Sequence, residues 1–370
     1  MHRLRAVFLL TTIEPKGHKW YDEIIKEKAG IQVRQYRKRE HVENYLKTEH
    51  RGSTLFEDVF LPHNSLPELA LEDIDTTTTF LGKEIAFPLM INAITGGTDF
   101  AEAINADLAE LAKRLGIPMA VGSETIAMED EEAIESFRIV RDIMGEEGIV
   151  IGNMNGNLSP EGAKRAVDII GADGLQIHLN PAQELAMDEG DRDFRGIKER
   201  IVAAKDALNV PVIVKEVGFG MDADVVETLY DAGIRYVDIS GFGGTNFFEV
   251  ENLRSLRRDM TDLYDWGLPT AYALSRAVAL EKKDLNIIAS GGIKTSLDLV
   301  KSLVIGADMC AMSGEILKYV LHGGVDYAEE YVSELIYKSK IIMVLLGSKD
   351  IQSLKHIRWR ATGRLLELLR

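Results

Sequence analysis

The amino-acid sequence predicts a (β/α)8 (TIM) barrel with an N-terminal extension and a helical C-terminal tail. From residue 88 onward, eight short apolar runs alternate with helical patterns, and each run ends in polar or small residues. Runs that are apolar without interruption, such as residues 149–151, are typical of parallel strands buried on both faces. Strands that alternate with helices in this way favour a barrel. The alternative, a doubly wound open sheet, is less favoured because no G-x-G-x-x-G follows an early strand.

The predicted elements follow one another along the chain. Strands are expected at residues 88–93, 118–122, 149–153, 174–179, 211–215, 236–240, 286–290 and 308–312. Helices that end at glycines are expected over residues 101–115, 222–232 and 296–303. Ser159 and Pro160 are typical of the N-cap and first turn of another helix.

The domain organisation is predicted to be simple. Residues 11–35 show little apolar periodicity, and we expect residues 1–35 to form an appendage of uncertain order. Residues 66–85, which include Pro67 and four consecutive threonines, are expected to form a loop-rich lead-in. Residues 36–370 are predicted to form one domain, since barrels of this type often exceed about 250 residues.

The composition excludes several classes of protein. The formal net charge of −16 argues against general nucleic-acid binding, although a locally positive pocket could still bind a small anion. The single cysteine, Cys310, excludes an intramolecular disulfide framework and a multi-cysteine metal site, and it fits a reducing cytosol. No segment approaches 18 uninterrupted apolar residues, so we expect a cytoplasmic protein without a membrane span.

Glycine-containing loops follow the seventh and eighth predicted strands. Gly291 and Gly292 follow the seventh strand, and Ser313 and Gly314 follow the eighth. In this fold these two loops commonly bind a phosphate, because backbone N–H groups and a helix N-terminus favour an anion. The alternative is a pair of tight turns.

Lys215 ends the fifth predicted strand, where a lysine is rarely free to be exposed. It could form a Schiff base, pair with a carboxylate, or hold the electron-rich atoms of a cofactor. A lysine whose stem is buried and whose amine reaches solvent is the structural alternative.

The segment from His178 to Glu184 is the most unusual in the sequence. Two polar residues at a strand end, His178 and Asn180, are closely followed by an amide and a carboxylate, Gln183 and Glu184. A carboxylate beside a phosphate site suggests Mg²⁺, which prefers oxygen ligands and bridges to phosphate. An ordinary acidic residue in the first turn of a helix is the alternative for Glu184.

A basic cluster, residues 37–41, precedes an expected helix over 42–47. Such clusters usually form solvated faces. Arginine and lysine side chains can also clamp a diphosphate, so both interpretations stay open.

Together these segments resemble the type 2, FMN-dependent isopentenyl-diphosphate isomerases of bacteria and archaea. The resemblance extends from about Arg37 to the end of the chain and is most specific in His-Leu-Asn-Pro-x-Gln-Glu, residues 178–184. Other matching segments are residues 37–41, 92–97, 214–218, 243–245 and 290–293. The resemblance implies interconversion of isopentenyl and dimethylallyl diphosphate without net redox change. It also implies FMN, Mg²⁺, NADPH or NADH as the reductant, and a homo-oligomer, tetrameric or larger.

The resemblance also assigns roles to individual residues. The substrate pocket is expected to contain Arg37, Lys38, His41, Asn180 and Gln183, with the first two on the diphosphate. Gln183 and His178 are the expected catalytic residues, and Glu184 is the expected Mg²⁺ ligand. The expected flavin-binding positions are Ala93, Ile94, Thr95, Ser123, Asn153, Lys215, Thr245, Gly291, Gly292, Ile293, Lys294, Ser313 and Gly314.

Two residues depart from the pattern of the family. Lys294 stands where the family more often has arginine, so a bidentate contact to the flavin phosphate is replaced by a point charge. Glu124 stands where glutamine is common, which adds a negative charge near a diphosphate pocket unless the side chain turns away or is paired.

Because the reaction only shifts a double bond, a reduced flavin could supply the proton from its own ring. An FMN-barrel oxidoreductase is the main alternative function. A non-catalytic flavin- or phosphate-binding protein is the second.

Overall fold

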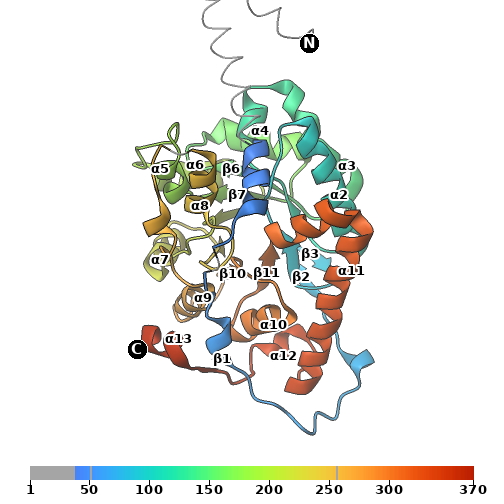
Figure 1. Cartoon of the computed structure of the whole chain (residues 1–370). Helices are drawn as coiled ribbons and strands as arrows, with labels where there is room; N and C mark the ends of the chain where they lie inside the picture. Colours follow the sequence, from blue (N-terminus) through green and yellow to red (C-terminus); the bar gives the residue numbers. More distant parts are fainter. Residues whose placement is uncertain (1–37, 51, 256) are drawn as a thin grey trace, which may run out of the picture.

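The computed structural model describes residues 38–50, 52–255 and 257–370, so the predicted appendage at residues 1–35 lies outside the described residues. Eight parallel strands close into one barrel in the order β10-β11-β4-β5-β6-β7-β8-β9 (Figure 1). The strands are β4 (Leu89–Ile91), β5 (Met119–Ala120), β6 (Val150–Asn155), β7 (Gly174–His178), β8 (Val212–Lys215), β9 (Tyr236–Asp238), β10 (Asn286–Ala289) and β11 (Met309–Met312). Each coincides with a predicted strand, so the barrel is confirmed.

Helices surround the barrel (Figure 1). They are α2 (Asp99–Leu115), α3 (Glu135–Met144), α4 (Pro160–Ile170), α5 (Pro181–Ala186), α6 (Ile197–Ala207), α7 (Ala223–Asp231), α8 (Phe247–Arg254), α9 (Thr270–Val278), α10 (Ser296–Ile305) and α11 (Gly314–Leu346). Short 3-10 helices span Phe56–Asp58, Leu71–Asp73, Glu124–Met128, Glu131–Ile134 and Thr261–Leu263. The predicted signals act locally: Gly116 ends α2 at a φ of 62°, and Ser159 Oγ accepts the Gly162 N–H at the start of α4.

A hairpin closes the barrel at the amino ends of its strands. β2 (Thr78–Phe80) pairs antiparallel with β3 (Lys83–Ile85), and Phe80 and Ile85 are buried against the residues that fill the barrel interior. The expectation of a loop-rich lead-in is therefore wrong for this part of residues 66–85. Threonine is β-branched and favours strands, and the two-residue turn has a positive φ at both positions.

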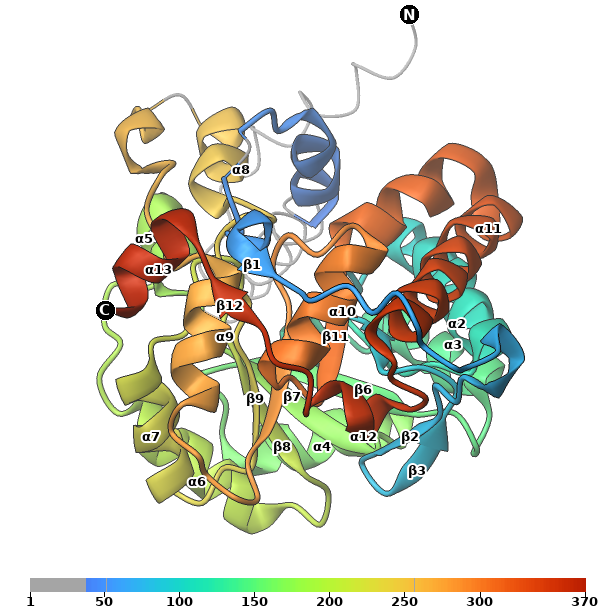
Figure 2. The ribbon, with the colours of Figure 1, turned by 90° about the horizontal axis from the view of Figure 1, so that it is seen from below.

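The C-terminal tail contains a strand as well as helices. α12 (Ile351–Leu354) and α13 (Gly363–Leu369) flank β12 (Arg360–Ala361), which pairs antiparallel with β1 (Val59–Phe60) (Figure 2). The expected helical tail is confirmed, and it also completes a small sheet with a segment about 300 residues earlier in the chain. Within the described residues, no helix has both the length and the apolar composition needed to span a bilayer.

A helix over residues 38–47 lies beside α8 (Figure 2). The backbone N–H groups of Glu49 and His50 donate to the Glu249 carboxylate of α8 at 2.8 and 3.1 Å. These bonds anchor the end of a helix whose side chains face the carboxyl ends of the barrel strands.

Candidate active site

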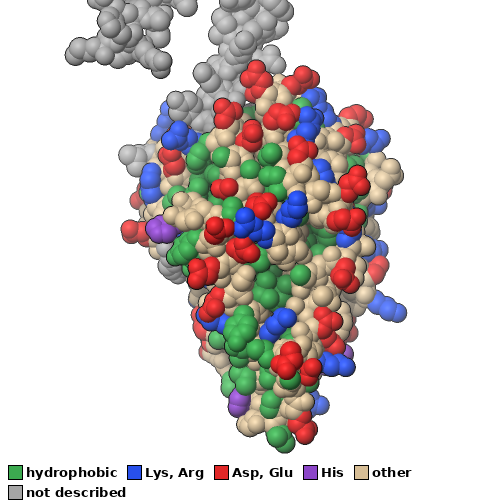
Figure 3. All heavy atoms as spheres, turned by 90° about the vertical axis from the view of Figure 1, so that its right-hand side faces the viewer, with side chains coloured by type: hydrophobic (Ala, Val, Ile, Leu, Met, Phe, Trp, Pro, Cys, Tyr) green, Lys and Arg blue, Asp and Glu red, His purple; other side chains and the backbone are tan. Residues whose placement is uncertain are grey.

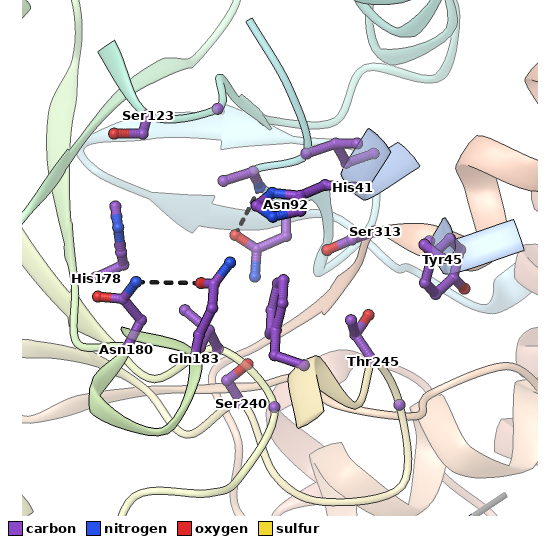
Figure 4. Close-up of a pocket in the computed structure, with 18 of the residues that line it drawn as sticks. His41, Tyr45, Asn92, Ser123, His178, Asn180, Gln183, Ser240, Thr245 and Ser313 are labelled. Atoms are coloured by element: carbon purple, nitrogen blue, oxygen red, sulfur yellow. Dashed lines mark hydrogen bonds between the residues drawn. The ribbon is translucent and has the colours of Figure 1, made fainter. Parts of the chain in front are cut away.

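The loops at the carboxyl ends of the strands enclose a cavity of about 580 Å³ (Figure 4). The predicted site residues that line it are Lys38, His41, Ala93, Ile94, Thr95, Ser123, Asn153, His178, Asn180, Gln183, Glu184, Lys215, Thr245, Gly291, Gly292, Ile293, Lys294, Ser313 and Gly314. Arg37 lies outside the described residues. The structure therefore brings every described residue of the predicted site to one cavity, while their individual roles stay predictions.

On one side of the cavity the wall is built from backbone. Gly291 and Gly292 have φ values of 96° and 73°, and a Cβ on Gly291 would lie 2.0 Å from the Gly241 carbonyl oxygen. Only glycine lets the loops after β9 and β10 approach so closely. Among the described residues no hydrogen bond engages the N–H groups of Gly292 and Ile293, and α11 begins nearby at Gly314. This backbone cradle fits the phosphate of FMN.

Lys215 lies in the wall at the end of β8, with 6% of its surface exposed. Its Nζ donates to the Glu216 carbonyl oxygen at 2.6 Å. The Glu216 carboxylate in turn accepts the N–H groups of Gly218, Phe219 and Gly220. The lysine is therefore held at the cavity by its own loop, and the alternative of an amine that reaches solvent is wrong.

Opposite the glycine loops, the segment from β7 to α5 contributes side chains. Asn180 Nδ2 donates to Gln183 Oε1 at 3.1 Å (Figure 4). It also donates to Glu184 Oε1 at 2.9 Å. The second oxygen of Glu184 accepts the Asp191 N–H at 2.9 Å. One asparagine thus orients both the amide and the carboxylate predicted to act on substrate and metal.

The acidic and histidine residues form no ready-made metal cage. Among the described residues, no group of three or more His, Cys, Asp or Glu side chains is placed to hold a cation. Glu184 supplies one carboxylate at the cavity. This arrangement fits Mg²⁺ only as an ion that one protein carboxylate and the phosphates of a bound ligand hold together.

The basic cluster divides between the cavity and solvent. Lys38 Nζ donates to the Ser123 carbonyl oxygen at 2.9 Å, and His41 Nε2 lies 2.7 Å from a carboxylate oxygen of buried Glu251. Arg39 instead pairs with Glu43 on the exposed face of the same helix. Arg39 therefore lies on a solvated face, whereas Lys38 and His41 line the cavity, where a role in binding a diphosphate stays a prediction.

Glu124, the unexpected acid, turns away from the cavity. Its side chain is fully buried, and Oε2 accepts the Asn153 N–H at 2.8 Å behind the wall. Burial raises the pKa of Glu124 to about 8 against the opposing effects of that hydrogen bond and of Lys38. A neutral acid behind the wall adds no negative charge to the cavity near neutral pH.

The sequence analysis did not predict that polar side chains in and behind the cavity wall are linked into one row. Asp238, Asn92, Gln176, Asn153 and His178 are linked by successive side-chain hydrogen bonds of 2.7 to 3.0 Å. Polar residues inside otherwise apolar strands were the available signal, because a buried polar group requires a partner. Also missed were two aromatic residues of the cavity wall, Tyr45 and Phe247.

The pKa of His178 lies far below its ordinary value. Burial, together with the charges of Lys215 and Lys38, lowers it to about 3. His178 is therefore neutral at physiological pH. Three lysines, Lys38, Lys215 and Lys294, line the cavity together with four acidic residues, Glu184, Glu189, Asp191 and Glu315, so the binding of an anionic small molecule there stays a prediction.

Solved structures share the fold. A lactate oxidase of Pediococcus acidilactici is 16% identical, with a TM-score of 0.64 over 85% of this chain and 89% of that protein. A mandelate oxidase in complex with (S)-2-phenylpropionate is 15% identical, with a TM-score of 0.60 over 84% of this chain and 88% of that protein. At such identities the likeness shows the barrel architecture alone.

Sequence comparisons define the family. Residues 180–360 match the family model described as FMN-dependent dehydrogenase. The isopentenyl-diphosphate delta-isomerase of Symbiobacterium thermophilum is 42% identical over 342 residues, which cover 90% of this chain and 94% of that protein. The enzyme of the same name from Listeria innocua is 40% identical and covers 90% of this chain and 93% of that protein. The chain therefore belongs to the type 2, FMN-dependent family of isopentenyl-diphosphate delta-isomerases.

Proposed function

We propose that this FMN-dependent isomerase interconverts isopentenyl and dimethylallyl diphosphate. One observation carries the proposal: the segment from His178 to Glu184 presents its polar side chains to the cavity that the glycine loops line. The glycine loops alone would serve any FMN barrel. A carboxylate and an amide oriented by one asparagine line the same cavity as Lys38 and would form a site for a diphosphate whose hydrocarbon part lies beside the flavin.

Different residues of the chain would bind different parts of the substrate. The cations of Lys38 and Arg37 would bind the diphosphate. An apolar surface from Val42, Phe247 and Val250 lines the same cavity and would accept the five-carbon chain. Gln183 is nearly buried, so its amide would be held close to the reacting carbons and would orient them.

Each cofactor would have a separate role in the reaction. Bound in its reduced form, FMN would supply the proton exchange that shifts the double bond. Mg²⁺ would be held by Glu184 and the diphosphate, and NADPH or NADH would keep the flavin reduced. His178 would complete the polar wall beside the substrate as a neutral imidazole.

A turnover assay tests the proposal. Purified protein with FMN, Mg²⁺, NADPH and isopentenyl diphosphate, kept free of oxygen, should form dimethylallyl diphosphate while consuming far less NADPH than product formed. Nucleotide oxidation equal to product would instead indicate an oxidoreductase. Bound FMN without any turnover would indicate a flavin-binding protein.

We also propose that the chain forms a homo-oligomer, tetrameric or larger, in the cytoplasm. Tyr337, Ile341 and Leu345 recur every four residues on α11 and are 37 to 53% exposed. Hydrophobic side chains gather on this side of the molecule (Figure 3). A stripe of this kind commonly packs against another copy. Light scattering coupled to size-exclusion chromatography would measure the mass, and a monomer would contradict the proposal.

A further inference from the structure

In the row of polar side chains from Asp238 to His178, each hydrogen bond has a fixed donor and a fixed acceptor. At one end, the fully buried Asp238 carboxylate accepts from Asn92 Nδ2 at 2.7 Å and from the Ser290 hydroxyl. It also accepts the Ser240 N–H at 3.1 Å. A carboxylate surrounded by donors is an acceptor, so Asn92 must turn its NH₂ group toward it.

Asn92 is fixed a second time, independently of Asp238. Its Oδ1 accepts the backbone N–H of Ala93 at 3.0 Å, and a backbone N–H can only donate. The same Oδ1 also accepts from Gln176 Nε2 at 2.9 Å. Both ends of the Asn92 amide are therefore assigned by chemistry.

The orientation of Asn92 then determines the donor and acceptor in each of the following hydrogen bonds. Since Gln176 donates to Asn92, its Oε1 must face Asn153, and Asn153 Nδ2 donates to it at 3.0 Å. This leaves Asn153 Oδ1 toward His178 Nδ1, at 2.8 Å. An amide oxygen cannot donate, so the ring nitrogen at Nδ1 must carry the hydrogen.

We propose that Gln176 is a positioning residue that fixes the Nδ1–H tautomer of His178. Gln176 is fully buried and does not line the cavity, so it acts only through Asn153. The ring of His178 then presents Nε2 as an acceptor to the cavity.

The tautomer restricts what His178 can do in the proposed function, which this inference deepens. A neutral ring in this form accepts a hydrogen bond from a water molecule, a hydroxyl or an N–H group. It has no hydrogen at Nε2 to donate to a phosphate oxygen. Anchoring of the diphosphate therefore falls to the cationic side chains, and His178 orients a donor beside it.

The tautomer is measurable in the resting holoenzyme without substrate. Magic-angle-spinning ¹⁵N NMR of protein labelled at the histidine rings distinguishes protonated from unprotonated ring nitrogens, and the His178→Asn spectrum identifies the signals of His178. At pH 7 we expect the Nδ1–H form to exceed the Nε2–H form by roughly tenfold, the ratio that one net hydrogen bond supports. A wild-type ring protonated at Nε2 would overturn the inference, whether or not the protein is an isomerase.

Two variants of similar size isolate the role of Gln176. Gln176→Glu keeps an acceptor for Asn153 Nδ2, and in its protonated form keeps a donor to Asn92, so the Nδ1–H form should persist. Gln176→Met removes the acceptor, which frees Asn153 to turn and should reduce the tautomer ratio by about fivefold or more. Equal ratios in the two variants would overturn the role of Gln176. Absence of isomerase activity with the expected tautomers would instead refute only the proposed function.

Discussion

The two sides of the cavity are built from different chemical groups. On the side of β10 and β11, glycines bring loops together and expose backbone N–H groups. On the side of β6 and β7, the contacts come from side chains, which hydrogen bonds connect into one array from Asn153 to His178 and another from Asn180 to Glu184. The first side, the glycine side, depends on positions that lack a side chain. The second side, the side-chain half, depends on the identity of its side chains.

The two sides therefore differ in chemical specificity. Backbone N–H groups bind a phosphate whatever the reaction. The amide, imidazole and carboxylate of the opposite side are chemically specific. We therefore expect substitutions on the first side to affect flavin binding and folding, and substitutions on the second to affect turnover.

The strongest test of the glycine side is Gly291→Ala. The added Cβ would lie 2.0 Å from the Gly241 carbonyl oxygen at a φ of 96°, so the loops must separate. We expect a loss of about 3 kcal/mol of unfolding free energy together with the loss of bound FMN. Thermal unfolding and flavin absorbance would measure both.

Gly145→Ala is the matched control. Gly145 also has a positive φ, of 68°, but its Cβ would meet nothing within 4 Å. It should lose about 2 kcal/mol, from backbone strain alone, and keep its FMN. If Gly291→Ala resembled this control, close approach of the loops would not be what the glycine provides.

The side-chain half is tested by Glu184→Gln. The substitution removes one negative charge at nearly constant volume, so fold and FMN content should be unchanged. Turnover should fall by roughly 100-fold, about 2.7 kcal/mol, and the Mg²⁺ concentration for half-maximal rate should rise.

Gln183→Asn separates the metal from the neighbouring amide. It shortens a side chain that lies beside Glu184 on the same helix, so the rate should fall with little change in Mg²⁺ dependence. Unaltered Mg²⁺ dependence in Glu184→Gln would refute its assignment as the ligand.

Glu124→Gln tests the acid buried behind the side-chain half. Burial raises the folded-state pKa to about 8 from an ordinary value of 4.5. Between these values the folded state binds more protons than the unfolded state, so the wild type loses stability as pH rises from 4.5 to 8. The variant lacks this loss and should be more stable by about 2 kcal/mol at pH 8, with no gain near pH 4.5. Chemical denaturation at both pH values would measure the unfolding free energies of wild type and variant. The same difference between the two proteins at pH 4.5 and at pH 8 would contradict the prediction.

The sequence predicted the barrel well because its strands are buried on both faces, which leaves uninterrupted apolar runs. The hairpin at residues 78–85 was missed, since a run of threonines is also typical of loops. Only contact with the barrel interior through Phe80 and Ile85 determines its conformation. Local sequence patterns therefore identified the elements whose conformation is determined by their own residues. They failed for the hairpin, whose conformation is determined by contact with a distant part of the fold.

The same distinction applies to the site. Motifs next to strand ends placed the predicted residues around one cavity. The polar row below it was not predictable, because its bonds join residues far apart in the chain, such as Asn92 and Asp238, 146 positions apart. A single sequence shows that Gln176 is polar within an apolar strand, but not which neighbour satisfies it.

The smallest expected effect belongs to Lys294→Arg, on the glycine side. The Lys294 N–H donates to Asp298, and its carbonyl oxygen accepts the Tyr331 hydroxyl at 2.8 Å, so the backbone is held independently of the side chain that lines the cavity. A guanidinium could therefore enter without moving the loop and offer phosphate a planar fork. FMN affinity should be unchanged or a few-fold tighter, less than about 1 kcal/mol, by isothermal titration calorimetry. Lys294→Met, which removes the charge, should weaken it. A large loss in the arginine variant would show that this residue serves something other than the flavin phosphate, and that the glycine side also depends on a specific side chain.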